Sequence, residues 1–154
     1  MATDFTYGGK QILSSGPNDW SRGFDLGEIG TGNFSETVFS EAYELMIKKV
    51  VERFPNARIM ALSLIGGRGQ YTNQNDVKEC TNGKGLVMND YSEIVKKVCS
   101  YHGIPCIDIH AEAGINVFNH TTYIGDIVHP NVEGGKMIAN AVINGMKRFE
   151  PIEF

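Results

Sequence analysis

An aspartate and a histidine stand three residues apart in Gly125-Asp-Ile-Val-His-Pro-Asn-Val-Glu-Gly134, just ahead of an apolar helical pattern. At that spacing Asp126 can bend back and accept a hydrogen bond from Nδ1–H of His129, which leaves the other ring nitrogen free as a general base. The alternative is an acidic residue and a histidine that only share a capping loop. The pair is therefore a candidate base with its orienting carboxylate.

The elements that must position this pair follow from the periodicity of apolar residues. Apolar side chains at three- and four-residue steps predict amphipathic helices, and nearly unbroken apolar runs predict strands buried on both faces of a parallel sheet. The chain alternates the two, so the expected fold class is α/β, a three-layer α/β/α domain of βαβαβα order. The expected strands are 10–15, 58–65 and 104–109, and the expected helices run from 35 to 54, from 89 to 103 and from 131 onward.

Length, composition and charge bound the class of protein. The 154 residues fit a single domain, 1–154, and the 42% hydrophobic and 21% charged residues are typical of a globular protein. The net charge of −4 offers no basic field to nucleic acid or to an anionic membrane. No apolar run of about 18 residues predicts a membrane span. No signal peptide is visible either, so a cytoplasmic location is the default expectation.

Metal and nucleotide sites are weakly indicated. Potential metal ligands between His110 and His129 have no regular spacing, which favours a solvated loop over a zinc site. Three cysteines, an odd number without a zinc-type spacing, favour reduced thiols. Gly66-Gly-Arg-Gly69 follows a predicted strand as a phosphate loop would, but it lacks Lys-Ser/Thr and no helix begins there. We therefore expect no metal and no organic cofactor.

Two motifs together resemble those of a known family. Asp-x-x-His-Pro-Asn-x-x-Gly, followed by a closing apolar helix, resembles the last block of the SGNH/GDSL hydrolases. Ser15-Gly-Pro-Asn-Asp-Trp20 resembles their Gly-x-Asn-Asp block, and it also stands at the end of a predicted strand, where open α/β sheets place their sites. The resemblance spans about Lys10 to Phe149.

The resemblance implies a flavodoxin-like sheet and a serine esterase that acts on acyl esters or on acetylated carbohydrates through an acyl-enzyme. It implies that the amide of Asn18 donates to the oxyanion, that His129 is the general base and that Asp126 orients it. The substrate-binding candidates are Gly16, Asp19, which would brace its loop, Trp20, which either walls the pocket or packs, and Arg68, which either contacts substrate or is solvated.

The nucleophile of that family has no match in the sequence. The family carries it in a Gly-Asp-Ser block well upstream of Gly-x-Asn-Asp, and no Gly-Asp-Ser occurs here. A base and an oxyanion donor without a nucleophile cannot carry out acyl transfer. We rank first a truncated or split hydrolase that needs missing N-terminal elements, and second a non-catalytic binding or assembly module. A third explanation is a substitute nucleophile at Ser14 or Ser15, whose alternative is turn chemistry.

The missing block also has a structural consequence. The flavodoxin-like strand order 2-1-3-4-5 places the first strand against the third, so loss of the first two strands exposes the edge of strand 10–15. We expect the N-terminal arm 3–7, a second copy of the chain or a partner with the missing strands to cover that edge. The isolated chain is therefore expected to self-associate, and a monomeric mass by light scattering at micromolar concentrations would contradict this.

Overall fold

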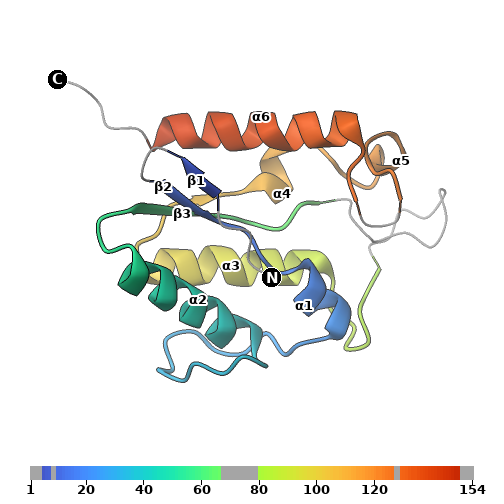
Figure 1. Cartoon of the computed structure of the whole chain (residues 1–154). Coiled ribbons are helices and arrows are strands. Elements are labelled where there is room, and N and C mark those ends of the chain that lie inside the picture. Colours follow the sequence, from blue (N-terminus) through green and yellow to red (C-terminus); the bar gives the residue numbers. More distant parts are fainter. Residues whose placement is uncertain (1–4, 8–9, 67–79, 127–128, 150–154) are drawn as a thin grey trace.

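The computed structural model describes residues 5–7, 10–66, 80–126 and 129–149. Its helices lie on both sides of a small sheet (Figure 1). In chain order the elements are β1 (Phe5–Tyr7), β2 (Lys10–Leu13), α1 (Pro17–Arg22), α2 (Phe39–Arg53), β3 (Arg58–Leu62), α3 (Met88–Tyr101), β4 (Cys106–Ile107), α4 (Ile109–Glu112), α5 (His120–Tyr123) and α6 (Val132–Arg148).

The sheet has the order β1-β2-β3-β4, and β2, β3 and β4 are parallel. The helix α2 lies in the connection from β2 to β3, and α3 lies in the connection from β3 to β4. Each pair of parallel strands is thus joined through a helix, as is typical of the right-handed crossovers of parallel sheets. Both helices lie on one face and α6 lies on the other (Figure 1). The α/β class and the three-layer arrangement predicted from the sequence are confirmed.

Alternate side chains of the strands point to opposite faces and build two apolar layers. Ile12 and Leu62 belong to the layer under α6, whereas Leu13 and Ala61 belong to the layer under α2 and α3. Burial on both faces explains why the carboxyl-terminal halves of β2 and β3 are apolar, while the polar residues Lys10 and Arg58 stand at their starts.

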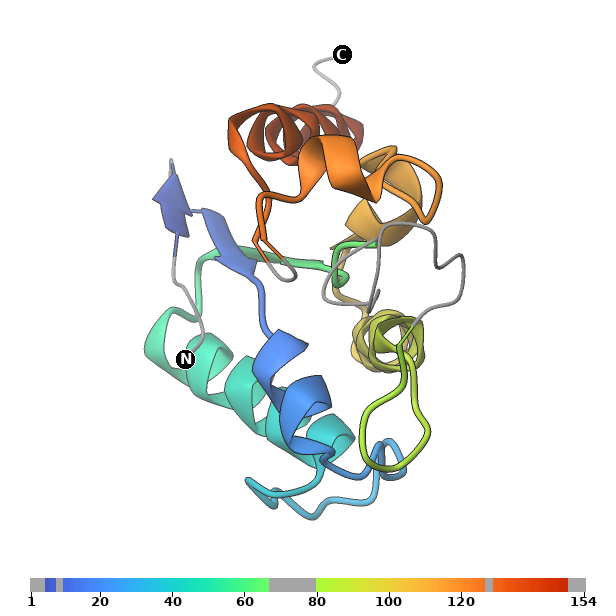
Figure 2. The same ribbon diagram turned by 90° about the vertical axis from the view of Figure 1, so that its right-hand side faces the viewer.

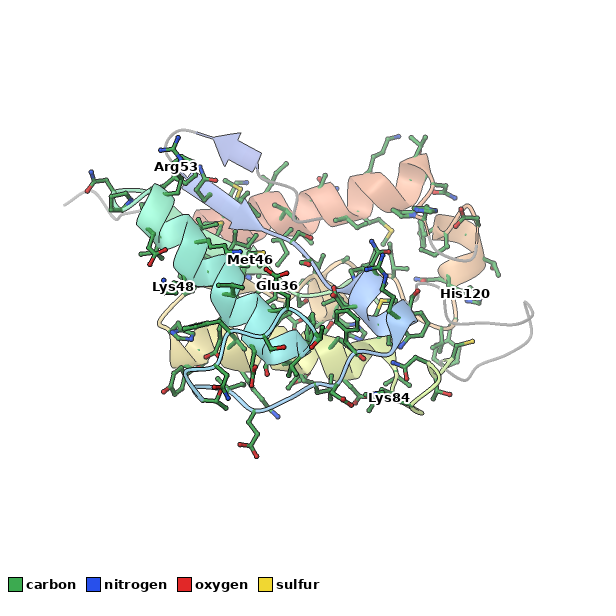
Figure 3. All side chains as sticks on the ribbon, turned by 60° about the horizontal axis from the view of Figure 1, so that its bottom comes forward. Glu36, Met46, Lys48, Arg53, Lys84 and His120 are labelled. Carbon is green, nitrogen blue, oxygen red and sulfur yellow. The ribbon has the colours of Figure 1, made fainter. Side chains whose placement is uncertain are left out.

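The helix α2 is amphipathic, and its two sides differ as its sequence period predicts. Tyr43 and Ile47 are buried against the core, while Lys48 and Arg53 are exposed and project from the surface seen in Figure 3. The helix begins at Phe39 rather than near residue 35, because the amides of Phe39 and Ser40 are bound by the carbonyls of Asp25 and Leu26.

Two strands are shorter than their apolar runs. The expected strand 58–65 ends at Leu62, and the amide of Leu64 donates to Oγ of Ser92 on α3 at 3.1 Å. The expected strand 104–109 is reduced to β4, because Asp108 turns the chain into α4 and accepts from the amide of Ala111 at 3.3 Å.

The outer edge of β2 is covered by β1, which pairs with it in antiparallel register from Phe5↔Ile12 to Tyr7↔Lys10. Of the three covers expected for this edge, the structure therefore shows the N-terminal arm, over Phe5–Tyr7. Self-association and a partner with further strands stay predictions.

A polar network joins the carboxyl ends of β3 and β4. The carboxylate of Asp108 accepts hydrogen bonds from Ser63 Oγ and Lys96 Nζ, each at 2.9 Å. Burial opposes the ionisation of Asp108, but the hydrogen bonds from Lys96, Ser63 and the Ala111 amide outweigh it, so the pKa of this carboxyl lies below its usual value.

Loss of this network is expected to destabilise the fold. Asp108→Ala removes the shared acceptor and should lower the free energy of unfolding by about 2 kcal/mol. Because the pKa of Asp108 is depressed in the folded protein, its stabilisation is present above the unfolded pKa of about 4 and is lost as the pH falls through the folded pKa. Thermal unfolding at neutral and acidic pH measures this. Between neutral and acidic pH, the melting temperature of the wild type should fall further than that of Asp108→Ala. Equal falls would contradict a depressed pKa of Asp108 in the folded protein.

Candidate active site

The chain reverses direction at the carboxyl ends of the parallel strands, and the two sequence motifs lie at this end. Figure 2 faces it: β2 leads into α1, and the segment between α5 and α6 comes forward beside them. Open α/β sheets place their binding sites at this edge.

Asp126 and His129 are in contact. Nδ1 of His129 lies 2.8 Å from Oδ2 of Asp126, and the backbone amide of His129 donates to Oδ1 at 2.5 Å. A carboxylate that binds Nδ1–H holds the neutral tautomer whose Nε2 can accept a proton. The His129 side chain is 71% exposed, and no hydrogen bond to Nε2 is present among the residues described. The geometry is that of a base with its orienting group, and the catalytic role stays a prediction.

A narrow loop presents this pair. Ile124 and Pro130 form an antiparallel bridge, and the amide of Gly125 donates to the carbonyl of His129 at 2.8 Å. This pairing holds the two ends of the loop together, so that Asp126 and His129 follow directly on its paired residues Gly125 and Pro130.

Asn131 fastens the loop to the first turn of α6. Its Oδ1 caps the helix by accepting from the amide of Gly134 at 3.0 Å, while its Nδ2 donates to the carbonyl of Thr122 at 2.7 Å. The amide of Asn131 donates to the carbonyl of Tyr123 at 2.9 Å. The contributions of Thr122 and Tyr123 were missed in the sequence, because backbone carbonyls leave no signal in residue types.

Gly134 allows the close approach of α6 to this loop. A Cβ at Gly134 would lie 2.2 Å from the carbonyl oxygen of Tyr123, whereas a Cβ at Gly135 would meet nothing within 4 Å. Only glycine therefore fits at position 134.

These adjacent glycines give a matched pair of variants. Gly134→Ala is expected to lower the free energy of unfolding by about 2–3 kcal/mol through overpacking against backbone. Gly135→Ala should raise it by up to about 1 kcal/mol, because alanine is the better helix former. Denaturant unfolding measures both. Equal effects of the two substitutions would show that the contact with Tyr123 does not constrain the loop.

The second motif begins with a tight turn. Gly16 has a φ of 131°, and a Cβ there would lie 2.8 Å from Cδ1 of Leu64, so glycine is required. Pro17 then starts α1, where its missing amide costs nothing. Asn18 follows on the first turn, is exposed, and forms no side-chain hydrogen bond with the described residues. Its amide is therefore open to a substrate, as its expected role requires.

The two residues after Asn18 face the protein. Asp19 lines a cavity of about 50 Å³ against Phe39 and Tyr43 of α2. Trp20 packs on the core, and its Nε1 donates to the carbonyl of Leu86 at 2.9 Å. The structure therefore gives Trp20 a packing role, which was one of the two alternatives expected from the sequence.

The remaining candidates are not joined to the histidine. Neither Ser14 nor Ser15 forms a hydrogen bond with His129 in the described structure. Arg68 lies outside the described residues. The structure thus brings Asp126 to His129 and leaves both serines apart from that pair.

Other potential metal ligands named from the sequence have partners of their own. Glu112 binds Arg148, at the far end of α6, through both carboxylate oxygens at 2.7 and 2.8 Å, and His120 Nδ1 lies 3.0 Å from the carbonyl of Val117. Within the described ranges, no three His, Cys, Asp or Glu side chains converge as metal ligands. No described helix is long and apolar enough to cross a membrane.

Comparison with known proteins decides the family. The model of the GDSL-like lipase/acylhydrolase family matches residues 11–137, which is more than half of the chain and includes both motifs. The chain belongs to this family. Among curated proteins, no sequence matches significantly.

Solved structures agree on the fold. A protein from Lactobacillus plantarum has a TM-score of 0.72 at 22% identity, and the match covers 87% of this chain and 64% of that one. A possible lipase from Chitinophaga pinensis has a TM-score of 0.66 at 16% identity, covering 90% and 73%. An acetyl xylan esterase has a TM-score of 0.54 at 20% identity, covering 86% and 64%. This GDSL-family chain thus spans about two thirds of the length of these proteins.

Proposed function

We propose that this chain is the part of a carboxylic ester hydrolase that supplies the base and an oxyanion donor. The observation that carries the proposal is the hydrogen bond between Asp126 and His129 at the carboxyl end of the sheet, which leaves Nε2 open. Membership of the GDSL-like family supports ester hydrolysis as the reaction class.

In this mechanism Nε2 of His129 removes the proton from a serine hydroxyl while the serine oxygen attacks the ester carbonyl. Asp126 stabilises the imidazolium that forms. The side-chain amide of Asn18 donates to the carbonyl oxygen as it becomes negative. The imidazolium then gives its proton to the leaving alcohol, and an acyl-serine remains. Water, activated by the same His129, attacks the acyl-serine, and the carboxylic acid and the free serine are released.

We propose that the serine lies in N-terminal elements of the hydrolase outside these 154 residues. No Gly-Asp-Ser occurs among them. Ser14 and Ser15 stand near the end of β2, but neither is bound to His129 in the described structure. The greater length of the matching solved structures agrees with a hydrolase that is truncated or split.

For the substrate we propose an acyl ester or an O-acetyl ester of a carbohydrate. The fold is similar to that of an acetyl xylan esterase. His129 and Asp126 are 71% and 57% exposed, so a bulky carbohydrate has access to them.

A second candidate function follows from the missing nucleophile. A chain with exposed Asn18 and His129, in which no described serine is hydrogen-bonded to His129, is also suited to bind an ester without cleaving it, as a binding or assembly module on the same scaffold. The two candidates differ in whether hydrolysis appears when a nucleophile is supplied.

Hydrolysis of p-nitrophenyl acetate by the purified chain tests the placement of the nucleophile. We expect wild type and His129→Ala to show the same background rate, because the base has no serine to activate. Turnover by the wild type that His129→Ala abolishes would contradict a split enzyme and place the nucleophile within this chain.

A further inference from the structure

The helix α1 carries Asn18 but has little packing of its own. It has only six residues, none of which is buried, and Trp20 packs only partly on the core. A donor that must meet one developing oxyanion has to be placed closely, because a misplacement of about 1 Å can cost about 10²-fold in rate. The contacts that hold α1 therefore determine how Asn18 is aimed.

A turn before α3 holds α1 through two hydrogen bonds, and this segment lies beside α1 in Figure 1. Nδ2 of Asn82 donates to the carbonyl of Trp20 at 3.0 Å, and Nε1 of Trp20 donates to the carbonyl of Leu86 at 2.9 Å. The side chain of each segment thus binds the main chain of the other. We call Trp20, Asn82 and Leu86, with these two bonds, the Asn82 clamp.

The amide of Asn82 can take only one orientation in this clamp. Its Oδ1 accepts from the amides of Lys84 at 2.9 Å and Leu86 at 3.1 Å. Its Nδ2 reaches Tyr91 Oη at 3.2 Å as well as the carbonyl of Trp20. Two donors and two acceptor positions are all that an asparagine amide offers, so the whole group is engaged. A flipped amide would put Nδ2 against two N–H donors.

The clamp is anchored in the core through Tyr91 of α3. The ring of Tyr91 is fully buried, and its hydroxyl also donates to the carbonyl of Phe24, two residues beyond the end of α1. Asn82 therefore stands between a rigid core residue and the last turn of α1. Few packing contacts of α1 compete with these polar contacts, because α1 itself buries no residue.

We propose that Asn82 is a positioning residue for ester hydrolysis, which fixes α1 through the main chain of Trp20 and so aims the amide of Asn18 at the oxyanion. Asn82 acts through α1 and not on the reacting atoms. This inference rests on the proposed function, since it names what holds the oxyanion donor of the same site.

The emission of Trp20 tests the clamp in residues 1–154, where Trp20 is the only tryptophan. Asn82→Ala should shift the emission maximum to longer wavelengths, because the indole loses its fixed place and meets more water. Asn82→Asp should do the same: it keeps an oxygen for the amides of Lys84 and Leu86 but has no N–H for Trp20. Circular dichroism at the same temperature shows that each variant is folded.

The matched control is Thr81→Ala, which changes the exposed neighbour of Asn82 and leaves the clamp as it is. Its emission maximum should equal that of the wild type. An emission maximum that both Asn82 variants leave unchanged would overturn the clamp.

Kinetics of the complete enzyme, in which the nucleophilic serine is present, test the positioning role. Asn82→Ala should lower kcat about tenfold with little change in KM, because a misaimed donor weakens the transition state more than the bound ester. In the Asn18→Ala background the same substitution should lower kcat no further, since Asn82 acts through Asn18. A merely structural role would lower kcat by the same factor in both backgrounds.

Equal losses of kcat with and without Asn18 would therefore overturn the positioning role of Asn82. Failure of the proposed function has a different signature. A complete enzyme that hydrolyses no ester would contradict the function, and the emission of Trp20 would still decide whether Asn82 holds α1.

Discussion

Alanine in place of His129 is expected to lower ester hydrolysis at least about 10³-fold in the complete enzyme, in which the nucleophilic serine of the proposed mechanism is present. The imidazole takes the proton from the nucleophile and returns it to the leaving alcohol, so its loss affects both acylation and deacylation. The change should appear in kcat, measured with p-nitrophenyl acetate, because His129 acts on the reacting atoms.

The partner of the histidine should give a related loss. Asp126→Asn keeps the size of the side chain but no longer fixes the tautomer, so kcat should fall by about 10²-fold or more. The control is His120→Asn, because His120 is the first residue of α5, the helix before the site loop, and the mechanism does not use it. A loss of activity in His120→Asn as large as that in His129→Ala would show that the effect is not specific to the base.

The second large effect is expected at Asn18. Asn18→Ala removes one donor to the oxyanion and should lower kcat by about 10²-fold with little change in KM, since the donor acts on charge that develops in the transition state. Asn18 is exposed and makes no side-chain hydrogen bond within the described structure, so the stability of the fold should not change. Steady-state kinetics and a thermal melt measure the two quantities.

Asn33→Ala serves as the control for this substitution, because Asn33 is an exposed amide in the loop that precedes α2. It should leave both kcat and the melting temperature as they are. A KM that rises while kcat stays constant in Asn18→Ala would assign Asn18 to substrate binding instead of oxyanion stabilisation.

The sequence predicts best what local pattern determines. The apolar steps along 39–53 and 132–148 place α2 and α6 within a few residues, and Asn131 is the N-cap of α6 as expected. The contact between Asp126 and His129 was also predictable, because a three-residue spacing lets Asp126 bend back to the Nδ1 of His129.

The sequence predicts poorly what long-range contacts determine. The end of β3 depends on Ser92, which lies 28 residues beyond Leu64. The role of Trp20 depends on the carbonyl of Leu86, 66 residues away. The N-terminal arm was only one of three expected covers for the edge of β2, because three residues carry too little pattern to predict a strand.

The most direct test of the account is the hydrolysis of p-nitrophenyl acetate by the complete enzyme, in which a segment that carries the nucleophilic serine is present together with these residues. We predict that the complete enzyme turns over the ester, that residues 1–154 alone do not exceed background, and that His129→Ala returns the complete enzyme to background. A complete enzyme without turnover, or one whose turnover His129→Ala leaves intact, would contradict the claim that His129 is the base of an ester hydrolase and Asp126 its orienting group.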